Sequence, residues 1–310
     1  QWLNEGNRHQ ASGNLFVDGF SRNSISLIID LYGQHRSDIF GQVYLEAKQM
    51  DVSPWLDQLI SQHVELSSSE ANFEAWGTIN SGLVDDITIE VSDTGINWGD
   101  QKQLKLKSAQ LNWWKVKDDW LLFGNDIVLD ANGEAFEGFN FSLRSEQGLK
   151  QLDVSRFNLA SVDSLFSLFE ATKNSATLSN ADLNGLVDIF QVQWDGEEPP
   201  IAFAEISKFG FLPAFEQGAA YLGVENTSLD LYWQQGRGLA RLTGENGTLA
   251  TRDTFSKTID YQTLDADIVF AQFDEFTSVS IPKLSFVNED LQANLSSQYL
   301  AQERAEQPVD

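Results

Sequence analysis

Most of the chain alternates apolar and polar residues with a period of two. The run from Ile25 to Leu31 has an apolar residue at every second position, and similar runs occupy residues 43–47, 104–107, 139–143, 229–233, 264–270 and 291–295. This alternation is typical of β-strands with one apolar face. Turn signals separate the runs, for example around Lys117-Asp118-Asp119 and around Gly236 and Gly238. The pattern predicts consecutive hairpins, and therefore an all-β, mainly antiparallel protein.

A four-residue motif occurs twice. Gly82-Leu83-Val84-Asp85 returns as Gly185-Leu186-Val187-Asp188, each followed by alternating apolar residues, so we expect each copy to begin a strand. A helix signal precedes each copy. Ser53-Pro54-Trp55 combines a capping residue with a first-turn proline and begins a helical spacing of apolar residues, whose side formed by Trp55, Leu56, Leu59 and Ile60 we expect to pack against the sheet. A helical spacing of apolar residues also begins at Ser161. We therefore expect two modules, residues 1–157 with a helix near 54–63 and residues 158–310 with a helix near 162–172. A third, weaker helix signal lies near 213–222.

Charge narrows the classes of partner. The 310 residues include 20 basic and 46 acidic side chains, a net charge of −26. Nucleic acids and anionic headgroups attract clustered Lys and Arg, so we expect no nucleic-acid partner and no electrostatic attachment to a membrane. Burial of an acyl chain requires no charge and stays possible. The chain has no cysteine, no apolar run of 18 residues and no signal peptide, and it begins with Gln1, so we interpret it as a fragment of a longer chain.

The sequence contains little that resembles catalytic machinery. The three histidines, His9, His35 and His63, occur in unrelated settings. Carboxylate pairs such as Asp118-Asp119 and Asp265/Asp267 lie at strand ends or on the polar side of a strand, where solvated acids are expected. No metal-ligand cluster and no Gly-rich phosphate loop occurs. We therefore expect a protein that is not an enzyme and binds no cofactor or metal.

Two roles are open for the apolar face of the strands. In most proteins with alternating strands, such a face forms the core of a β-sandwich. Alternatively, because the helix signals are too few to cover it, the sheet is bent and open along one side and its face holds an apolar ligand. Two functions fit this choice: a lipid conduit, or an extracellular carbohydrate-binding or carbohydrate-cleaving β-protein, which the acidity and nine tryptophans favour. A sugar site needs exposed aromatic platforms, whereas a conduit needs an uninterrupted aliphatic trough.

Several stretches resemble one protein family. They are MDVSPWLDQLI at residues 50–60, the two GLVD strands that end at Trp98 and Trp194, and residues 202–233 and 248–270. Over residues 16–300 the chain is similar to the YhdP family of AsmA-like bacterial envelope proteins. The resemblance implies an elongated, curved, open β-groove with about three short helices. It further implies a periplasmic protein that carries phospholipid between the inner and outer membranes of a Gram-negative envelope. The inner-membrane helix of such proteins is absent from this chain, and no outer-membrane partner is indicated.

Residues at the centres of alternating runs are the candidates for contact with phospholipid acyl chains. Their sequence neighbours are polar, so we expect their side chains to point into one shared interior. A slip of one residue in strand register would turn the whole set outward. The expected lipid-binding residues are Leu27, Ile29, Val43, Leu45, Leu104, Leu106, Leu231, Ile268 and Phe270.

Overall fold

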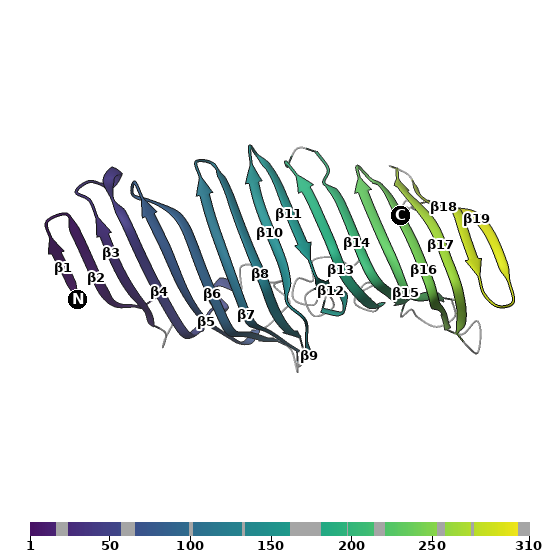
Figure 1. Ribbon diagram of the computed structural model, residues 1–310, viewed down its shortest axis with the longest axis horizontal. Coiled ribbons are helices and arrows are strands. Elements are labelled where there is room, and N and C mark those ends of the chain that lie inside the picture. The colour runs from purple at the N-terminus through teal and green to yellow at the C-terminus, as the bar shows by residue number, and fades with distance from the viewer. Residues whose placement is uncertain are drawn as a thin grey trace, which may run out of the picture. The chain divides into compact units, whose positions relative to one another are not determined.

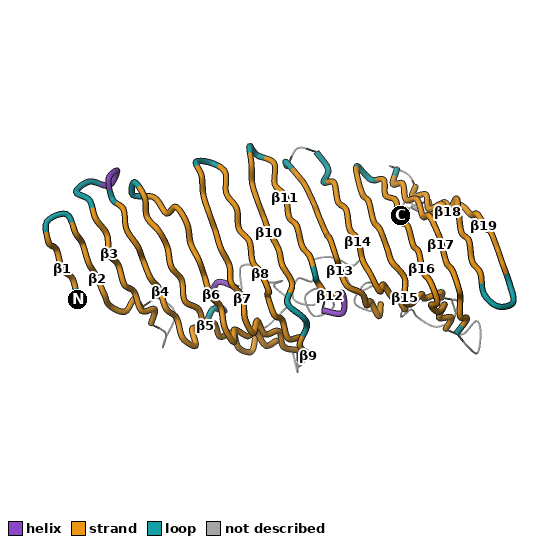
Figure 2. Tube along the Cα trace, viewed as in Figure 1, coloured by secondary structure: helices purple, strands orange, loops and turns teal. Residues whose placement is uncertain are grey.

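The computed structural model describes residues 1–16, 24–56, 66–98, 102–131, 134–161, 181–196, 198–213, 221–252, 258–273 and 276–302. In this part of the chain nearly all of the backbone is strand (Figure 2). Contacts within the chain divide it into two compact units, Gln1–Lys150 with Ser161–Ala176, and Gln151–Ala160 with Thr177–Asp310. The expected all-β, antiparallel class is confirmed.

The first unit is an open antiparallel meander in which consecutive strands pair side by side (Figure 1). Beyond the meander, β8 also pairs with β9 and β10. The strands are β1 (Trp2–Glu5), β2 (Arg8–Phe16), β3 (Ser24–Tyr32), β4 (Phe40–Asp51), β5 (Leu66–Asn80), β6 (Leu83–Trp98), β7 (Lys102–Val116), β8 (Asp119–Ala131), β9 (Glu134–Ala135) and β10 (Phe139–Glu146).

The second unit repeats this architecture. From β13 to β19 each strand pairs antiparallel with the next (Figure 1). The strands are β11 (Leu149–Ser155), β12 (Phe157–Asn158), β13 (Ala181–Trp194), β14 (Ile201–Pro213), β15 (Tyr221–Gln234), β16 (Arg237–Arg252), β17 (Ile259–Gln272), β18 (Phe276–Val287) and β19 (Gln292–Gln302).

Two-residue turns join several of the hairpins. Ser81-Gly82, Gln147-Gly148 and Gln235-Gly236 each have positive φ at both residues, between 50° and 88°. Two consecutive positive φ angles characterise the type I′ turn, whose twist matches that of paired strands. The turn expected at Lys117-Asp118-Asp119 is confirmed for its first two residues, since β7 ends at Val116 and β8 begins at Asp119. The turn expected around Gly236 and Gly238 is confirmed at Gly236, between β15 and β16, whereas Gly238 lies inside β16.

Helix is scarce in the described residues. The first expected helix begins at Ser53 as α1 (Ser53–Leu56), and 3₁₀ turns η1 (Arg36–Asp38) and η2 (Leu159–Ser161) are the other helical elements there. The continuation of the first helix to residue 63 and the helix expected near 162–172 lie outside the described residues. The same holds for the helix expected near 213–222, except that residue 213 ends β14 and residues 221 and 222 begin β15. Of the three short helices expected, the structure therefore tests and supports only the beginning of the first.

The two GLVD copies are not structurally equivalent. Gly82 lies in the turn before β6 with a φ of 69°, and Leu83 beyond it is 66% exposed. Gly185 lies inside β13, beside a shift in strand register, and Val187 is 6% exposed. The expectation that both copies begin a strand is therefore wrong for the second copy. A glycine accommodates a turn in one case and an irregular strand in the other, so the shared letters do not mark a shared position.

Extra residues interrupt three strands of the first unit. Strand pairing shifts near Gln49 on β4, Asp93 on β6 and Asp126 on β8, and these residues have φ angles of 51°, 41° and 48°. Such a β-bulge bends the strand and reverses the alternation of side chains beyond it. On β4 the buried residues Ala47 and Met50 are three positions apart, on either side of the bulge. The bulges thus keep apolar residues on one face.

The second unit uses the same device. Lys208 on β14, Asn226 on β15 and Asn246 on β16 have φ angles of 50°, 58° and 53°, and pairing shifts beside the first two. Thr227 and Val224 are three positions apart across Asn226, yet both are buried, at 2% and 9% exposure. The extra residue at the bulge therefore changes the spacing between buried positions on β15 from two residues to three.

The apolar face of each unit is a single layer. Met50 and Ser161 are the largest described side chains less than 2% exposed, and small residues such as Ala47, Ala75 and Ala240 form much of the buried set. A sandwich core would instead enclose many large side chains between two sheets. Within the described residues the sheet of each unit is open, and no second sheet packs on it.

Candidate functional site

Four of the expected residues meet on β3 and β4. Leu27 pairs with Leu45, and Ile29 pairs with Val43. The row continues from Leu45 to Ala75 on β5. Residues directly opposite each other in antiparallel strands project from the same face of the sheet. All four expected residues are only half-buried, so this face, here called the inner face, presents apolar side chains to its surroundings.

The row through Leu45 is apolar over eight strands. At Gly124 it lacks a side chain, and a Cβ added there would lie 2.8 Å from Phe141 and Ile127 and 2.9 Å from Leu111. Glycine thus lets its larger neighbours close over the sheet at this point. The row comprises Gly13, Leu27, Leu45, Ala75, Ile89, Leu111, Gly124 and Phe141.

Leu104 belongs to a buried cluster at one end of the inner face. It packs against Trp98, which is 3% exposed, together with Ile96 and Leu66. Leu56 of α1 packs against the same indole. The beginning of the helix therefore covers this end of the face, as its apolar spacing predicts, while the side chains of the other residues expected on its apolar side, Trp55, Leu59 and Ile60, lie outside the described set.

Leu106 reaches the inner face because β7 is irregular. Simple alternation would place Leu106 on one face with Ser108 and Gln110. The pairing of β7 with β8 shifts on both sides of Ser108. Ala109 beyond the shift is 6% exposed and Leu106 is half-buried, whereas Ser108 is exposed. The irregularity thus places Leu104, Leu106 and Ala109 on one face, although Leu106 and Ala109 are three residues apart rather than two or four.

The remaining three expected residues lie together in the second unit. Leu231 pairs with Ala240, which pairs with Ile268, and Phe270 pairs with Gly238 one row further along the strands. Small residues on β16 therefore separate larger residues on β15 and β17. This alternation in size leaves depressions in the apolar face between the larger side chains.

An apolar hollow of about 300 Å³ lies in this part of the second unit. Its lining includes the expected residues Leu231 and Phe270, together with Phe190, Ala204 and Trp233. Phe190 and Trp233 are not among the nine expected residues. Their signal was present in the sequence, since each occupies an apolar position in an alternating run, as Phe270 does.

The nine expected residues are divided between the two units. The first unit contains Leu27, Ile29, Val43, Leu45, Leu104 and Leu106, and the second contains the other three. Their contact with acyl chains stays a prediction.

The opposite face of the sheet, here called the outer face, is more polar. In the second unit Arg241 Nε lies 2.9 Å from Asp267 Oδ1, and Lys283 pairs with Asp265. The hydrogen bond to Asp267 raises the pKa of Arg241. The two aspartates therefore form ion pairs across strands, and no described contact places them in a catalytic arrangement.

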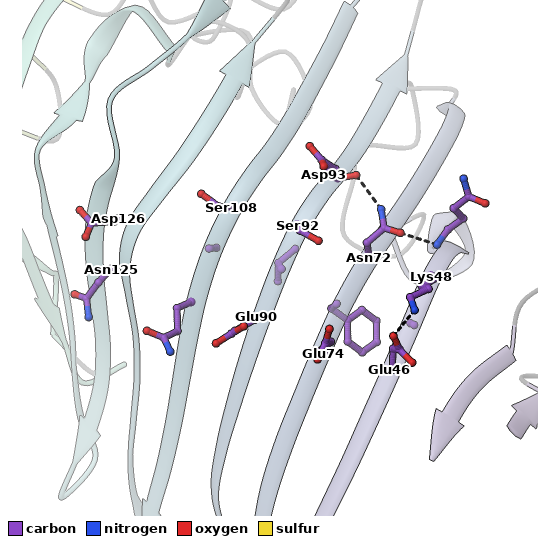
Figure 3. Close-up of a pocket in the computed structure, with 16 residues that line it drawn as sticks. Glu46, Lys48, Asn72, Glu74, Glu90, Ser92, Asp93, Ser108, Asn125 and Asp126 are labelled. Carbon is purple, nitrogen blue, oxygen red and sulfur yellow. Dashed lines mark hydrogen bonds and ion pairs between the residues drawn. The ribbon is translucent and has the colours of Figure 1, made fainter. Parts of the chain in front are cut away.

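A second hollow, of about 890 Å³, follows the bulges of the first unit (Figure 3). Its lining includes Glu46, Glu74, Glu90 and Asp93, and Lys48 forms an ion pair with Glu46. The lining also includes Phe73 and Val91 and is therefore mixed, unlike the apolar hollow of the second unit, and its carboxylates do not suit an acyl chain. The described residues contain no group of three or more His, Cys, Asp or Glu side chains that could hold a metal ion. No helix among them is long and apolar enough to span a membrane.

Comparison with known proteins identifies the family. The chain matches the family model described as YhdP protein over residues 1–309. It is 27% identical over 104 residues to the intermembrane phospholipid transporter YhdP of Escherichia coli (strain K12), a match covering 33% of this chain and 8% of that protein. The chain thus spans a small part of the length of this relative. No solved structure matches it. Because the family model covers nearly the whole chain, the protein belongs to the YhdP family.

Proposed function

We propose that this chain is part of a conduit that carries phospholipid between the inner and outer membranes of a Gram-negative envelope. Its inner face holds the acyl chains, and the two units, residues 1–157 and 158–310 in the expected division, supply consecutive lengths of one curved groove. It acts without catalysis, in the periplasm, and the longer protein is anchored to the inner membrane. The observation that carries the proposal is the eight-strand apolar row through Leu45, whose expected lipid contacts are only half-buried.

The chemistry of the inner face supports a lipid more than a sugar. Burial of apolar area is worth about 25 cal/mol per Å², and an acyl chain gains this along its length without any directional contact. The hollow beside Leu231 and Phe270 is lined by aliphatic and aromatic side chains. A sugar would need hydrogen-bonding groups beside the aromatic rings, because its hydroxyl groups lose water on binding.

Family membership supports the same function. The relative is named as an intermembrane phospholipid transporter, and the bulges found on both units bend strands, as a sheet that curves around a ligand requires. Transport, rather than storage, gains from a face that continues from strand to strand, because a chain can then move along it without re-entering water.

Site-specific photo-crosslinking in cells tests the proposal. A photoreactive residue at Leu45, Leu231 or Ile268 should label phospholipid. The same residue at Lys105 or Val269, which project from the outer face, should not. Labelling at the outer positions alone would refute the assignment of faces and the conduit together.

Paired aspartate substitutions provide an independent test. Ile268→Asp places a charge on the inner face and should block lipid transport in cells that depend on this protein, because a carboxylate beside an acyl chain loses hydration. Val269→Asp is the matched control, since Val269 is the next residue, is 37% exposed and lies on the outer face. Equal loss of transport in the two variants, with both proteins folded, would contradict the proposal.

A further inference from the structure

The outer face of the first unit has an exposed apolar stripe that the proposed conduit does not use. Ile28, Tyr44 and Trp76 are consecutive register partners on β3, β4 and β5. Ile28 is 52% exposed and Trp76 is 39% exposed. The Tyr44 and Trp76 rings lie 5.6 Å apart, centroid to centroid. Exposed apolar side chains that gather in one stripe mark an interaction surface more often than isolated ones do.

Aromatic residues continue the stripe on β7 and β8. Phe123 on β8 lies in the same row as Trp76 on β5, and the polar pair of Thr88 on β6 and Asn112 on β7 lies between them. The ring of Trp114, 48% exposed, lies 5.1 Å from that of Phe123. From β3 to β8 there are five strand spacings, a distance of about 24 Å at about 4.8 Å each.

A row of carboxylates runs beside the stripe. Glu46, Glu74 and Glu90 are register partners on β4, β5 and β6 and lie in line across these strands (Figure 3). On β4 and β5 they lie two residues from Tyr44 and Trp76, a displacement of about 6.8 Å along the strands. Like charges directly opposite each other on neighbouring strands destabilise a sheet, so a cationic partner would relieve a repulsion built into this face.

The three carboxylates are compensated to different degrees. Lys48 pairs with Glu46, and the hydroxyl of Tyr44 donates a 3.0 Å hydrogen bond to Glu74 Oε2. Burial, this hydrogen bond and the nearby glutamates raise the pKa of Tyr44 to about 12, which keeps the phenol protonated as a donor. The side chain of Glu90 has no hydrogen bond or ion pair with another described residue. Negative charge is therefore left over at the edge of the apolar stripe.

We propose that the outer face of the first unit docks a cationic amphipathic helix of a partner protein. The apolar side of the helix lies on the stripe through Trp76, and Lys or Arg on its flank meet Glu74 and Glu90. A length of about 24 Å corresponds to about sixteen helical residues at 1.5 Å each. Anionic lipid headgroups and a second copy of this face are repelled by the same carboxylates.

The test uses the full 310-residue chain and a synthetic peptide. The peptide has about eighteen residues, with Leu and Ala along one stripe and Lys along the flank, a pattern that forms an amphipathic helix. The expected result is saturable binding, observed as a change in tryptophan fluorescence and confirmed by calorimetry. A peptide with Glu in place of Lys should not bind. Equal binding of both peptides, or no binding of the Lys peptide, would overturn the proposal.

Charge reversal assigns the binding to this face. Glu74→Lys combined with Glu90→Lys should weaken binding by about tenfold or more, because attraction becomes repulsion at two positions. Glu245→Lys combined with Asp290→Lys makes the same change in net charge at exposed acids of the second unit and should leave affinity within about twofold. Circular dichroism establishes whether both double variants are folded. If the Glu74→Lys, Glu90→Lys protein is not folded, Glu90→Gln replaces it as a milder change. Equal weakening by the two double variants would show attraction to net charge alone and reject the site.

The aromatic stripe provides a second criterion. Trp76→Ser leaves every charge in place and should also weaken binding of the Lys peptide by about tenfold, because it removes an exposed indole from the stripe. Unchanged affinity in this variant would rule out docking along the stripe. Binding of phosphatidylglycerol vesicles in preference to the peptide would replace the protein partner by a lipid surface and likewise overturn the proposal.

Discussion

The side chain of Asn72 accepts, through Oδ1, a hydrogen bond of 2.8 Å from the backbone N–H of Gln49 on the neighbouring strand. Its Nδ2 donates to the carbonyl of Asp93 on the other side, at 3.1 Å. Gln49 and Asp93 are the bulged residues of β4 and β6. One amide between them thus holds two bulges that keep the inner face apolar (Figure 3).

Removal of this amide should destabilise the first unit. We expect Asn72→Ala to lower the free energy of unfolding by about 1–2 kcal/mol, because two backbone groups lose a partner. Urea denaturation measures the change. Gln110→Ala, at an exposed position of β7, should stay within about 0.5 kcal/mol of the parent. An Asn72→Ala protein as stable as the parent would show that the bulges do not depend on this side chain.

Trp98 should contribute mainly through its ring. Its Nε1 is buried without a hydrogen-bond partner among the described residues, and the ring packs with Leu56 and Leu104. We expect Trp98→Ala to cost about 3–5 kcal/mol of unfolding free energy through loss of packing. Trp98→Phe should cost less than about half of this, because it keeps much of the ring and removes an unpaired donor. Similar losses for the two variants would show that the indole N–H has a partner in solution.

Asp51 should make the beginning of α1 sensitive to acid. Its Oδ1 accepts hydrogen bonds from Ser53 N and Oγ, at 3.0 and 2.6 Å, and from Ser69 Oγ at 3.0 Å. These bonds lower the pKa of Asp51, with the Ser53 side chain as the largest cause. A carboxylate whose pKa is lowered by folding stabilises the folded state above its unfolded pKa of about 3.9 and loses that effect as the pH falls through the lower folded value.

Hydrogen exchange measures this effect locally. The amide of Leu56 donates to Val52 O at 3.1 Å. Its protection factor, the intrinsic exchange rate divided by the observed rate at the same pH, should fall below about pH 4 in the parent protein. In Asp51→Asn the protection factor should already be lower at neutral pH, and it should depend less on acid. Parallel acid profiles in the two proteins would remove Asp51 as the cause.

Tyr261 should confer the opposite dependence in the second unit. It is 2% exposed, its hydroxyl donates a 3.0 Å hydrogen bond to Glu225 O, and burial raises its pKa. A raised folded pKa gives stability that is fully present below the unfolded value of about 10 and is lost as the pH rises through the folded value. Tyr261→Phe should cost about 1 kcal/mol at neutral pH through the lost hydrogen bond, and its stability should fall less between about pH 9 and 11. Urea denaturation over this range compares the two proteins, and an unchanged slope would contradict the assignment.

Local alternation determined much of this protein. Pairs such as Leu27 with Leu45 and Ile29 with Val43 could be expected on one face because side chains on a strand repeat every two residues, whatever the partner strand. The turn at Lys117-Asp118 was likewise visible, since turn preferences reside in a few adjacent residues. These features need no information from distant parts of the chain.

The tertiary structure decided where alternation breaks and what the apolar face meets. Leu106 and Ala109 share a face only because β7 becomes irregular at Ser108, and the bulge at Gln49 is held by a side chain 23 residues away. The second GLVD copy lies within a strand because of its pairing with β14. An apolar row has the same spacing whether a second sheet covers it or not. Strand register, and whether another layer covers the apolar face, depend on contacts between segments far apart in sequence. An alternation with a period of two is a local pattern and carries no information about either.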